Sequence, residues 1–174
     1  MKIIKTKFKG LLLIEGQKFK DNRGYFREIL VEKKLKKKFP FKVISLSKKN
    51  VIRGLHYQLN KPQGKFISVL KGKILDVAVD LRKKSKTFGQ HYKIILSHKN
   101  CKSIFIPEGF AHGFKGINKE NIVSYSCTNY RNKSGERGIL WNDKKLNINW
   151  NVKKPIISKK DKLNPNFKDF FNTK

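Results

Sequence analysis

Short apolar stretches separated by turn residues recur along most of this chain, and that pattern predicts β-strands. Alternation is clearest over 74–81, where Leu75, Val77, Val79 and Leu81 fall on one face of the predicted strand. Many short strands with few helices predict an all-β fold, a sandwich or a barrel. The predicted strands cover, in chain order, 10–16, 24–30, 41–47, 51–58, 65–72, 73–82, 91–97, 102–109, 111–117 and 122–130.

Turn and breaker residues define the remaining elements. The lysine-rich stretch 31–39 is compatible with one short helix, which Pro40 would end, and a tight hairpin is predicted around Lys71-Gly72. The tail from about residue 140 is rich in Asn, Lys and Pro, so we expect it to be irregular, with a short helix after Pro165. No fixed-period repeat or linker divides the sequence, and we therefore expect one domain covering 1–174.

Composition argues against a membrane-spanning protein. Hydrophobic residues make up 38% of the chain, but no apolar run approaches the roughly 20 residues of a membrane span. The opening residues MKIIKTKFKG lack the apolar core of a secretory signal. Cys101 and Cys127 show no CxxC spacing, so we expect two free thiols, a reducing compartment and a cytoplasmic location.

The formal net charge of +30 favours anionic partners: nucleic acid, anionic lipid or a phosphorylated small molecule. The competing interpretation is a solvated, lysine-biased surface without a specific partner. A basic nucleic-acid-binding barrel is therefore one alternative, although no aromatic pair stands in a basic strand motif of the RNA-recognition type. Arginine is more informative than lysine, because its rigid fork suits phosphate and only six arginines occur: Arg23, Arg27, Arg53, Arg82, Arg131 and Arg137.

The strand predicted at 51–58 carries candidate chemistry. Alternation places Ile52 and His56 on one face of it and Arg53 on the other. Lys65 and Tyr125 lie on other predicted strands. If the corresponding faces line one barrel, His56, Lys65 and Tyr125 converge as a base, a cation and an acid, which suits proton abstraction next to a carbonyl. A packed structural histidine is the competing interpretation.

The stretch IPEGFAHGF (106–114) resembles the second motif of the cupin barrels and places His112 near the start of a strand. Metal-binding cupins carry His-x-His in their first motif, whereas the matching place here reads HYQ, with one histidine. A metal site needs three or four ligands. The sequence therefore predicts a jelly-roll (cupin) barrel without a metal.

Several linked motifs, in order, resemble one family over about residues 10–170: the dTDP-4-dehydrorhamnose 3,5-epimerase family of nucleotide-sugar epimerases. The motifs are DNRGYFRE, VIRGLHYQ, QGKFISVLKGKILDVAVDLRKKSKTFG, FIPEGFAHGF, YSCTNY, GILWNDKKLNINW and ISKKDKLNP. The resemblance implies a homodimeric jelly-roll enzyme that needs no cofactor. It would convert dTDP-4-dehydro-6-deoxy-D-glucose to dTDP-4-dehydro-L-rhamnose, inverting C3 and C5, for lipopolysaccharide or another cell-surface polysaccharide.

The resemblance also implies roles for individual residues. His56 would be the base, Asp161 in the tail would hydrogen-bond that histidine, Lys65 would stabilise the enolate and Tyr125 would be the acid. The implied substrate-binding residues are Arg23 and Arg53 on the diphosphate, Phe26 as an apolar wall, His112 on the sugar or phosphate, and Glu28, Glu136, Lys160, Tyr130 and Arg131 on the nucleotide sugar.

Two positions depart from the family pattern. Phe41 and Val43 stand where many members have Gln-x-Asn, and Arg131, with Tyr130 beside it, stands where members have a base-stacking Tyr. Both departures concern which base and sugar are bound. The rival interpretations are a mono-epimerase or an enzyme acting on another nucleotide-4-ketosugar, and an inactive sugar-nucleotide sensor. A 3,4-ketoisomerase is disfavoured, because it usually carries another histidine two residues after His56.

Overall fold

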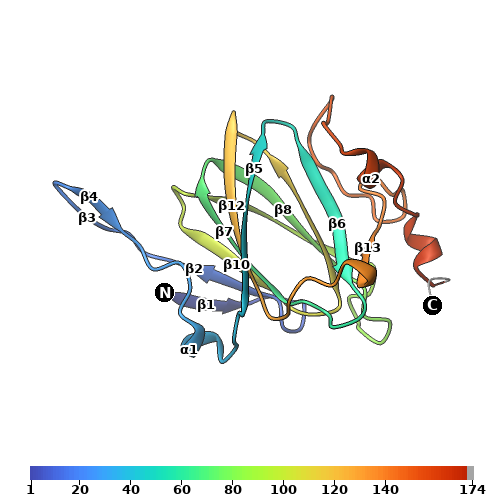
Figure 1. Cartoon of the computed structure of the whole chain (residues 1–174), viewed down its shortest axis with the longest axis horizontal. Coiled ribbons are helices and arrows are strands. Elements are labelled where there is room, and N and C mark those ends of the chain that lie inside the picture. Colours follow the sequence, from blue (N-terminus) through green and yellow to red (C-terminus); the bar gives the residue numbers. More distant parts are fainter. Residues whose placement is uncertain (172–174) are drawn as a thin grey trace.

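Two antiparallel sheets face one another across the core of the molecule (Figure 1). The computed structural model describes residues 1–171, so the last three residues of the expected 1–174 domain lie outside the described part. The six-stranded sheet contains, in spatial order, β1 (Lys2–Lys5), β2 (Leu12–Glu15), β10 (Lys102–Ile106), β7 (Lys65–Lys71), β12 (Glu120–Cys127) and β5 (Phe41–Lys48). The five-stranded sheet contains β13 (Glu136–Gly138), β6 (Ile52–Gln58), β11 (Phe110–Gly116), β8 (Lys73–Asp80) and β9 (His91–Ser97).

The remaining elements are short. A separate hairpin consists of β3 (Phe19–Asp21) and β4 (Gly24–Phe26). The helices are α1 (Glu32–Leu35), α2 (Lys159–Lys162) and the 3-10 turns η1 (Lys133–Gly135) and η2 (Phe167–Phe171). The all-β prediction is confirmed. Within residues 1–171, no helix is long and apolar enough to cross a membrane.

The main core fills the space between the two sheets. Alternate residues of the facing strands point inward and lose their contact with water, which is the main stabilising contribution to such a barrel. Phe8 and Leu11, from the turn between β1 and β2, belong to the same cluster. The strand residues of this cluster are Ile67, Val69, Ile74, Ala78, Leu96, Ile104, Ile106, Phe110, Phe114 and Val123.

Residues 139–170 form a second apolar layer on the outer face of the five-stranded sheet (Figure 1). Trp150 and Phe167 of this segment pack with Leu55 and Val79 of the sheet. The segment is also tied to β6 by the backbone, because Ile139 exchanges two hydrogen bonds with Leu55, at 2.9 and 3.2 Å. The expected irregular tail therefore lies in a fixed place, beside the strand that carries His56.

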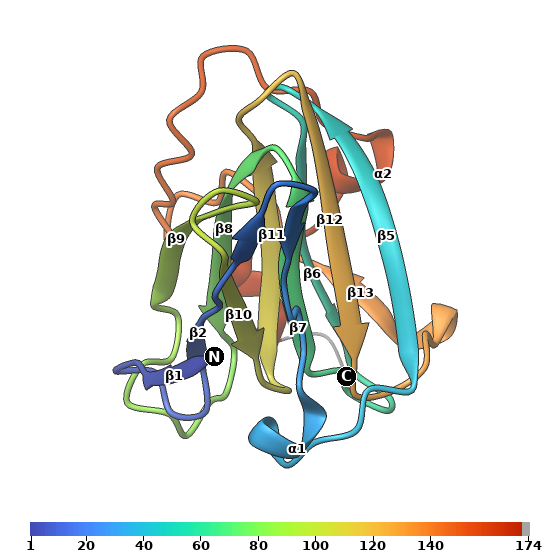
Figure 2. The same ribbon diagram turned by 90° about the vertical axis from the view of Figure 1, so that its left-hand side faces the viewer.

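The outer face of the six-stranded sheet is only partly covered. Leu35 and Phe39, from α1 and the turn after it, pack on Phe66 and Phe105. Figure 2 shows this sheet with α1 below it and β5 along its edge. Beyond the covered part, apolar side chains remain exposed: Ile44, Leu46 and Leu70.

The hairpin predicted around Lys71-Gly72 is wrong. Strands β7 and β8 flank Gly72 but belong to different sheets, so the chain turns a corner between sheets here. Gly72 has φ +84°, and a Cβ on it would lie 2.2 Å from the Glu120 carbonyl oxygen. The left-handed glycine is needed at this corner just as it would be in a hairpin, and the local sequence does not distinguish the two.

Other element boundaries also differ from prediction. The strand expected at 24–30 is only β4, paired with the unpredicted β3 in a projecting hairpin. Strands β1 and β13 were not predicted. The helix expected over 31–39 spans only α1, and the helix expected after Pro165 is the 3-10 turn η2.

The simple alternation predicted along β6 is also wrong, because the strand contains a bulge. His56 pairs with His112 of β11, but Arg53 pairs with Phe114, so three steps along β6 match two along β11. Gly54, with φ +128°, lies at this irregularity. The extra residue changes the parity of the strand, so Arg53 and His56 line the same cavity although they are three residues apart.

Candidate functional site

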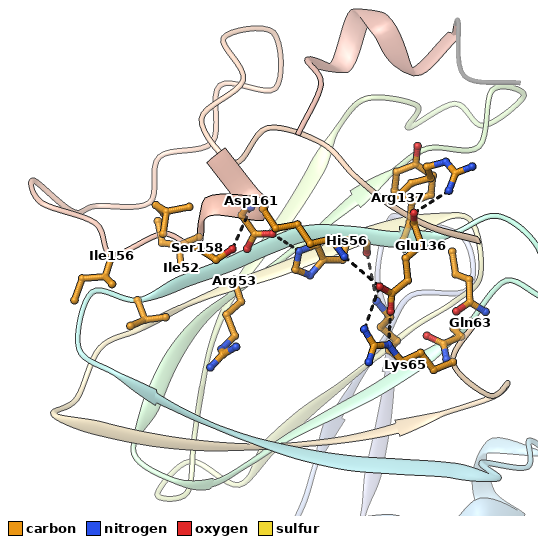
Figure 3. A pocket seen from close by; sticks show the side chains of 16 residues that line it. Ile52, Arg53, His56, Gln63, Lys65, Glu136, Arg137, Ile156, Ser158 and Asp161 are labelled. Atoms are coloured by element: carbon orange, nitrogen blue, oxygen red, sulfur yellow. Dashed lines mark hydrogen bonds and ion pairs between the residues drawn. The ribbon is translucent and has the colours of Figure 1, made fainter. Parts of the chain in front are cut away.

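A cavity of about 520 Å³ opens beside β6 (Figure 3). Its walls come from β6, the start of β7, the segment around β13 and the segment that leads into α2. Figure 3 shows that these residues come from chain segments far apart in sequence. Seven of the predicted site residues line it: Arg53, His56, Lys65, Arg131, Glu136, Lys160 and Asp161.

The most distinctive contact in this cavity joins His56 and Asp161. His56 Nε2 lies 2.6 Å from Asp161 Oδ1, and Oδ2 accepts a hydrogen bond from the Gly54 N–H at 3.3 Å. The His56 side chain is 41% exposed and that of Asp161 only 5%. Burial by itself raises the pKa of Asp161, but the hydrogen bonds from His56 and Gly54 outweigh it and lower the pKa. An ionised carboxylate thus holds an accessible imidazole in one orientation.

Local sequence explains how α2 presents this carboxylate. Ser158 caps the helix, because its Oγ accepts a hydrogen bond from the Asp161 N–H at 3.1 Å. Just before the cap, Ile156 bonds through its backbone to the start of β6 and the turn before it, accepting from the Ile52 N–H and donating to the Asn50 carbonyl. The helix is therefore docked on the strand that carries the histidine.

Lys65 provides a cation next to His56. Its Nζ donates to the His56 carbonyl at 3.3 Å. Burial lowers the pKa of Lys65, while electrostatic interactions with Cys127 and Glu136 act in the opposite direction. Cys127 is also its cross-strand partner on β12. The ammonium group is only partly hydrated, so its field acts strongly on any oxygen bound beside it.

Tyr125 and His112 are not among the residues that line this cavity, but His112 adjoins one that does. His112 is the cross-strand partner of His56, and the rings of His112 and Tyr125 are 6.2 Å apart between centroids, nearly perpendicular. The Tyr125 hydroxyl lies 3.4 Å from Ser45 Oγ. Burial raises the pKa of Tyr125, so the phenol stays protonated at neutral pH.

Arg53 is a free cation at the cavity wall. Its Nε donates to Ser47 Oγ at 2.8 Å and its Nη2 to the Leu46 carbonyl at 3.1 Å. Within residues 1–171, no carboxylate pairs with it. In Figure 3 the guanidinium projects into the cavity, where an anionic group can reach its remaining donors.

Glu136 joins two cations at the rim of the cavity. Arg131 bonds it through Nε and Nη2, at 2.5 and 3.2 Å, and Lys160 through Nζ at 3.1 Å. These contacts, that of Arg131 above all, lower the pKa of Glu136 to about 2 despite partial burial. The carboxylate is therefore ionised at neutral pH, and it fixes the plane of the Arg131 guanidinium.

Four predicted binding residues lie elsewhere. Tyr130 is exposed beside Phe41 at the rim, with 6.2 Å between ring centroids. Arg23, Phe26 and Glu28 lie on or just after the β3–β4 hairpin, which extends away from the barrel on the side opposite α2 (Figure 1). Within one copy of the chain, these three residues do not reach the cavity.

Sequence reasoning missed Asp76. It is fully buried on the inward face of β8, where its Oδ2 accepts from His112 Nε2 at 2.8 Å. Its Oδ1 has no hydrogen-bond partner among the described residues. The signal was available, because a carboxylate between Ile74 and Ala78 on an apolar face requires a polar partner. Within residues 1–171, no group of three or more His, Cys, Asp or Glu could hold a metal ion.

Comparisons with known proteins agree on one family. A family model described as dTDP-4-dehydrorhamnose 3,5-epimerase matches residues 5–169. The chain is 44% identical over 168 residues to the dTDP-4-dehydrorhamnose 3,5-epimerase of Shigella flexneri, covering 92% of this chain and 93% of that protein.

Two solved structures are similar over nearly their whole length. The dTDP-4-dehydrorhamnose 3,5-epimerase of Bacillus anthracis, with TDP and PPi bound, gives a TM-score of 0.92 at 42% identity, covering 95% of this chain and 99% of that one. The dTDP-6-deoxy-D-glucose-3,5-epimerase of Legionella pneumophila, in complex with dTDP-4-keto-L-rhamnose, gives 0.90 at 39% identity, covering 95% and 92%. The protein is thus an isomerase, and its chain belongs to the dTDP-4-dehydrorhamnose 3,5-epimerase family.

Proposed function

We propose that this protein inverts C3 and C5 of dTDP-4-dehydro-6-deoxy-D-glucose to give dTDP-4-dehydro-L-rhamnose, without a cofactor. The observation that carries the proposal is the pairing of a half-exposed His56 with a buried Asp161 in a cavity that also contains Lys65. Relatives of the same family bind TDP or dTDP-4-keto-L-rhamnose, which supports a dTDP-sugar as the substrate.

Proton removal falls to His56. The C4 ketone of the substrate acidifies the C–H bonds at C3 and C5, and the neutral imidazole accepts one of these protons. Asp161 then stabilises the resulting imidazolium across the 2.6 Å contact. The electron pair released from the C–H bond moves to the C4 oxygen, where the Lys65 ammonium stabilises the enolate charge.

Proton return falls to Tyr125. Inversion requires that the new proton arrive on the face opposite the base, so base and acid must be different residues. Because burial raises the pKa of Tyr125, its hydroxyl holds a proton to deliver. Tyr125 is on β12 of the six-stranded sheet, whereas His56 is on β6 of the facing sheet, and this suits delivery from the far side of the sugar ring.

The nucleotide half of the substrate is assigned to the cations of the cavity. Arg53 has donors free for the diphosphate, and Arg131 and Lys160 add positive charge at the rim. Arg131 stands where an aromatic residue is expected from the family pattern, and this favours a second candidate: an epimerase of the same mechanism on another nucleotide-4-ketosugar, or one that inverts a single carbon.

We further propose a homodimer. The exposed apolar residues Ile44, Leu46 and Leu70 form an uncovered sheet face that a second copy would bury. The β3–β4 hairpin, called the arm below, carries Arg23, with Glu28 just after it, away from its own cavity. In a dimer the arm would bring these residues to the cavity of the other copy.

The two cysteines are free thiols, which suits the reducing cytoplasm.

Proton NMR in deuterium oxide tests the reaction. The wild-type protein should exchange the C3 and C5 protons of dTDP-4-dehydro-6-deoxyglucose and yield an L-configured product. His56→Ala should abolish both exchanges, whereas His98→Ala, away from the cavity, should not. Tyr125→Phe should keep exchange but impair inversion, with Tyr92→Phe as its control. Exchange at one carbon alone would identify a mono-epimerase, and absence of exchange above the His56→Ala level would contradict this substrate.

The nucleic-acid alternative rests on the net charge of +30 and on the aromatic residues, which make up 11% of the chain. A gel shift measured against salt concentration tests it. Binding that disappears at moderate salt would indicate only general attraction between a basic surface and a polyanion.

A further inference from the structure

The arm is fastened to the barrel by the guanidinium of Arg27, which directly follows β4. Its Nη2 donates to Ser68 Oγ at 3.2 Å, to the Cys101 carbonyl at 3.2 Å and to Ser103 Oγ at 3.4 Å. Ser68 and Ser103 are buried cross-strand partners on β7 and β10, with 2.6 Å between their hydroxyl oxygens. The chain segment that follows β4 is therefore fixed to the outer face of the six-stranded sheet.

The chain segment that leads into β3 is fixed at the same place. Gly16, a few residues before β3, donates its N–H to the Cys101 carbonyl at 3.1 Å, and this carbonyl also accepts from Arg27. A Cβ on Gly16 would lie 2.9 Å from that oxygen and 3.6 Å from Arg27 Nε. Because the segments before β3 and after β4 both donate to the Cys101 carbonyl, this point sets the direction in which the arm leaves the barrel.

The rest of the arm is held only by itself. Within the described chain, the hydrogen bonds and ion pairs of residues 17–26 are internal, between Arg23 and Asp21 and along the β3–β4 ladder. Phe19 packs on Phe26 of the same hairpin, with 6.3 Å between ring centroids. A rotation at the anchor would therefore move the whole arm.

The uncharged surroundings of the Arg27 guanidinium indicate that this residue does more than stabilise the fold. Its hydrogen-bond partners are neutral, no carboxylate among residues 1–171 pairs with it, and its Nε is buried without a partner. Removing part of a guanidinium from water without an opposite charge is unfavourable, and an apolar side chain would cover the same surface at lower cost. What the guanidinium adds is a planar set of donors with fixed directions.

We propose that Arg27 is a positioning residue for the epimerase reaction. It fixes the angle of the arm, so that Arg23 and Glu28 enter the cavity of the second copy. This inference rests on the proposed dimer and substrate. It assigns Arg27 a function through the arm, and none in contact with the reacting atoms.

The test compares Arg27→Met and Arg27→Lys with Lys20→Met, which removes one charge from the same arm without touching the anchor. We expect Arg27→Met to raise KM about tenfold while kcat stays within about twofold, because substrate binding is weakened and the chemistry is not. Amides 17–26 should exchange with deuterium faster than in the wild type. Arg27→Lys keeps the charge but not the planar donors, and should give an intermediate KM. Lys20→Met should match the wild type in both measurements.

Unchanged KM and amide exchange in Arg27→Met and Arg27→Lys would overturn the proposal. A lower Tm with unchanged KM would also overturn it, because it would make Arg27 merely structural. Arg23→Ala and sedimentation of the wild type test the underlying dimer separately. If the wild type is a monomer and Arg23→Ala changes nothing, delivery of the arm to a partner fails, whereas the exchange rates still decide whether Arg27 anchors the arm.

Discussion

Replacing Asp161 with Asn changes the charge beside His56 and almost nothing in volume. The Asp161 side chain is 5% exposed, and its carboxylate accepts from two donors at once, the His56 ring and the Gly54 N–H. An amide has one oxygen, so it can accept from only one of them. The other donor then faces an NH2 group. The imidazole loses its fixed tautomer where the NH2 group faces it, and in either amide orientation it loses the charge that stabilises its protonated form.

The expected magnitude follows from burial. A hydrogen bond to a charged group contributes about 1.5–3 kcal/mol, and loss of the tautomer in His–Asp pairs reduces rates by up to about 10⁴. The His56 side chain is 41% exposed, so water screens part of the effect. We expect Asp161→Asn to reduce kcat/KM by about 10²–10³-fold, which corresponds to about 3–4 kcal/mol of transition-state stabilisation.

The assay is steady-state turnover combined with deuterium exchange at C3 and C5, with circular dichroism to establish folding. Ser158→Ala is the matched control, because it removes the α2 cap but leaves the carboxylate in place. We expect that control to lose less than about tenfold, in line with about 1 kcal/mol for a helix cap. A folded Asp161→Asn variant that keeps activity within fivefold of wild type would refute the role of the carboxylate.

Three further predictions address the cation, an internal carboxylate and the β6 bulge. Burial lowers the pKa of Lys65, so the ammonium form, and with it kcat/KM, should be lost as pH rises to a value below the usual pKa of lysine. A decrease in kcat/KM that begins only at the ordinary lysine pKa would contradict this prediction. Burial raises the pKa of Asp80, but hydrogen bonds from Arg82 and neighbouring hydroxyls outweigh it and bring the pKa to about 2. Its ionised form should therefore contribute about 2 kcal/mol to unfolding free energy above pH 4, lost as pH falls towards 2. Denaturant unfolding of Asp80→Asn should show this loss at pH 7 and a smaller difference at pH 2. Gly54→Ala should lose more than about 3 kcal/mol or fail to fold, because its Cβ would lie 2.5 Å from Gly113 Cα, whereas Gly24→Ala, with open space around it, should fold.

The sequence was sufficient for the strands of the core and insufficient for their spatial relations. Strand β8 was predicted because its residues alternate between two buried faces, one in the core between the sheets and one under the outer apolar layer. The corner at Gly72 was missed because a left-handed glycine fits a hairpin and a change of sheet equally well. The bulge in β6 depends on the contact between Gly54 and Gly113, on a strand far away in sequence, and local alternation contains no information about it.

The site was predictable to a similar extent. Strand alternation pointed to His56 and Lys65, motif resemblance added Asp161, and these three line one cavity. It did not indicate that the arm points away from that cavity, because this depends on the path of the chain after Gly16 and on what a second copy provides. The contact between Glu136 and the Arg131 guanidinium also needed coordinates, since five residues along a loop fix no distance.

The His56–Asp161 contact joins residues 105 positions apart, and Asp161 belongs to the layer that covers the outside of the five-stranded sheet. That layer is held mainly by apolar packing around Trp150 and Phe167, whereas the barrel is held by continuous strand ladders. A local opening of the layer would separate the carboxylate from the imidazole while the barrel stayed folded. Heat inactivation of this enzyme is therefore expected to follow detachment of its outer layer, at a lower temperature than the melting of its strands.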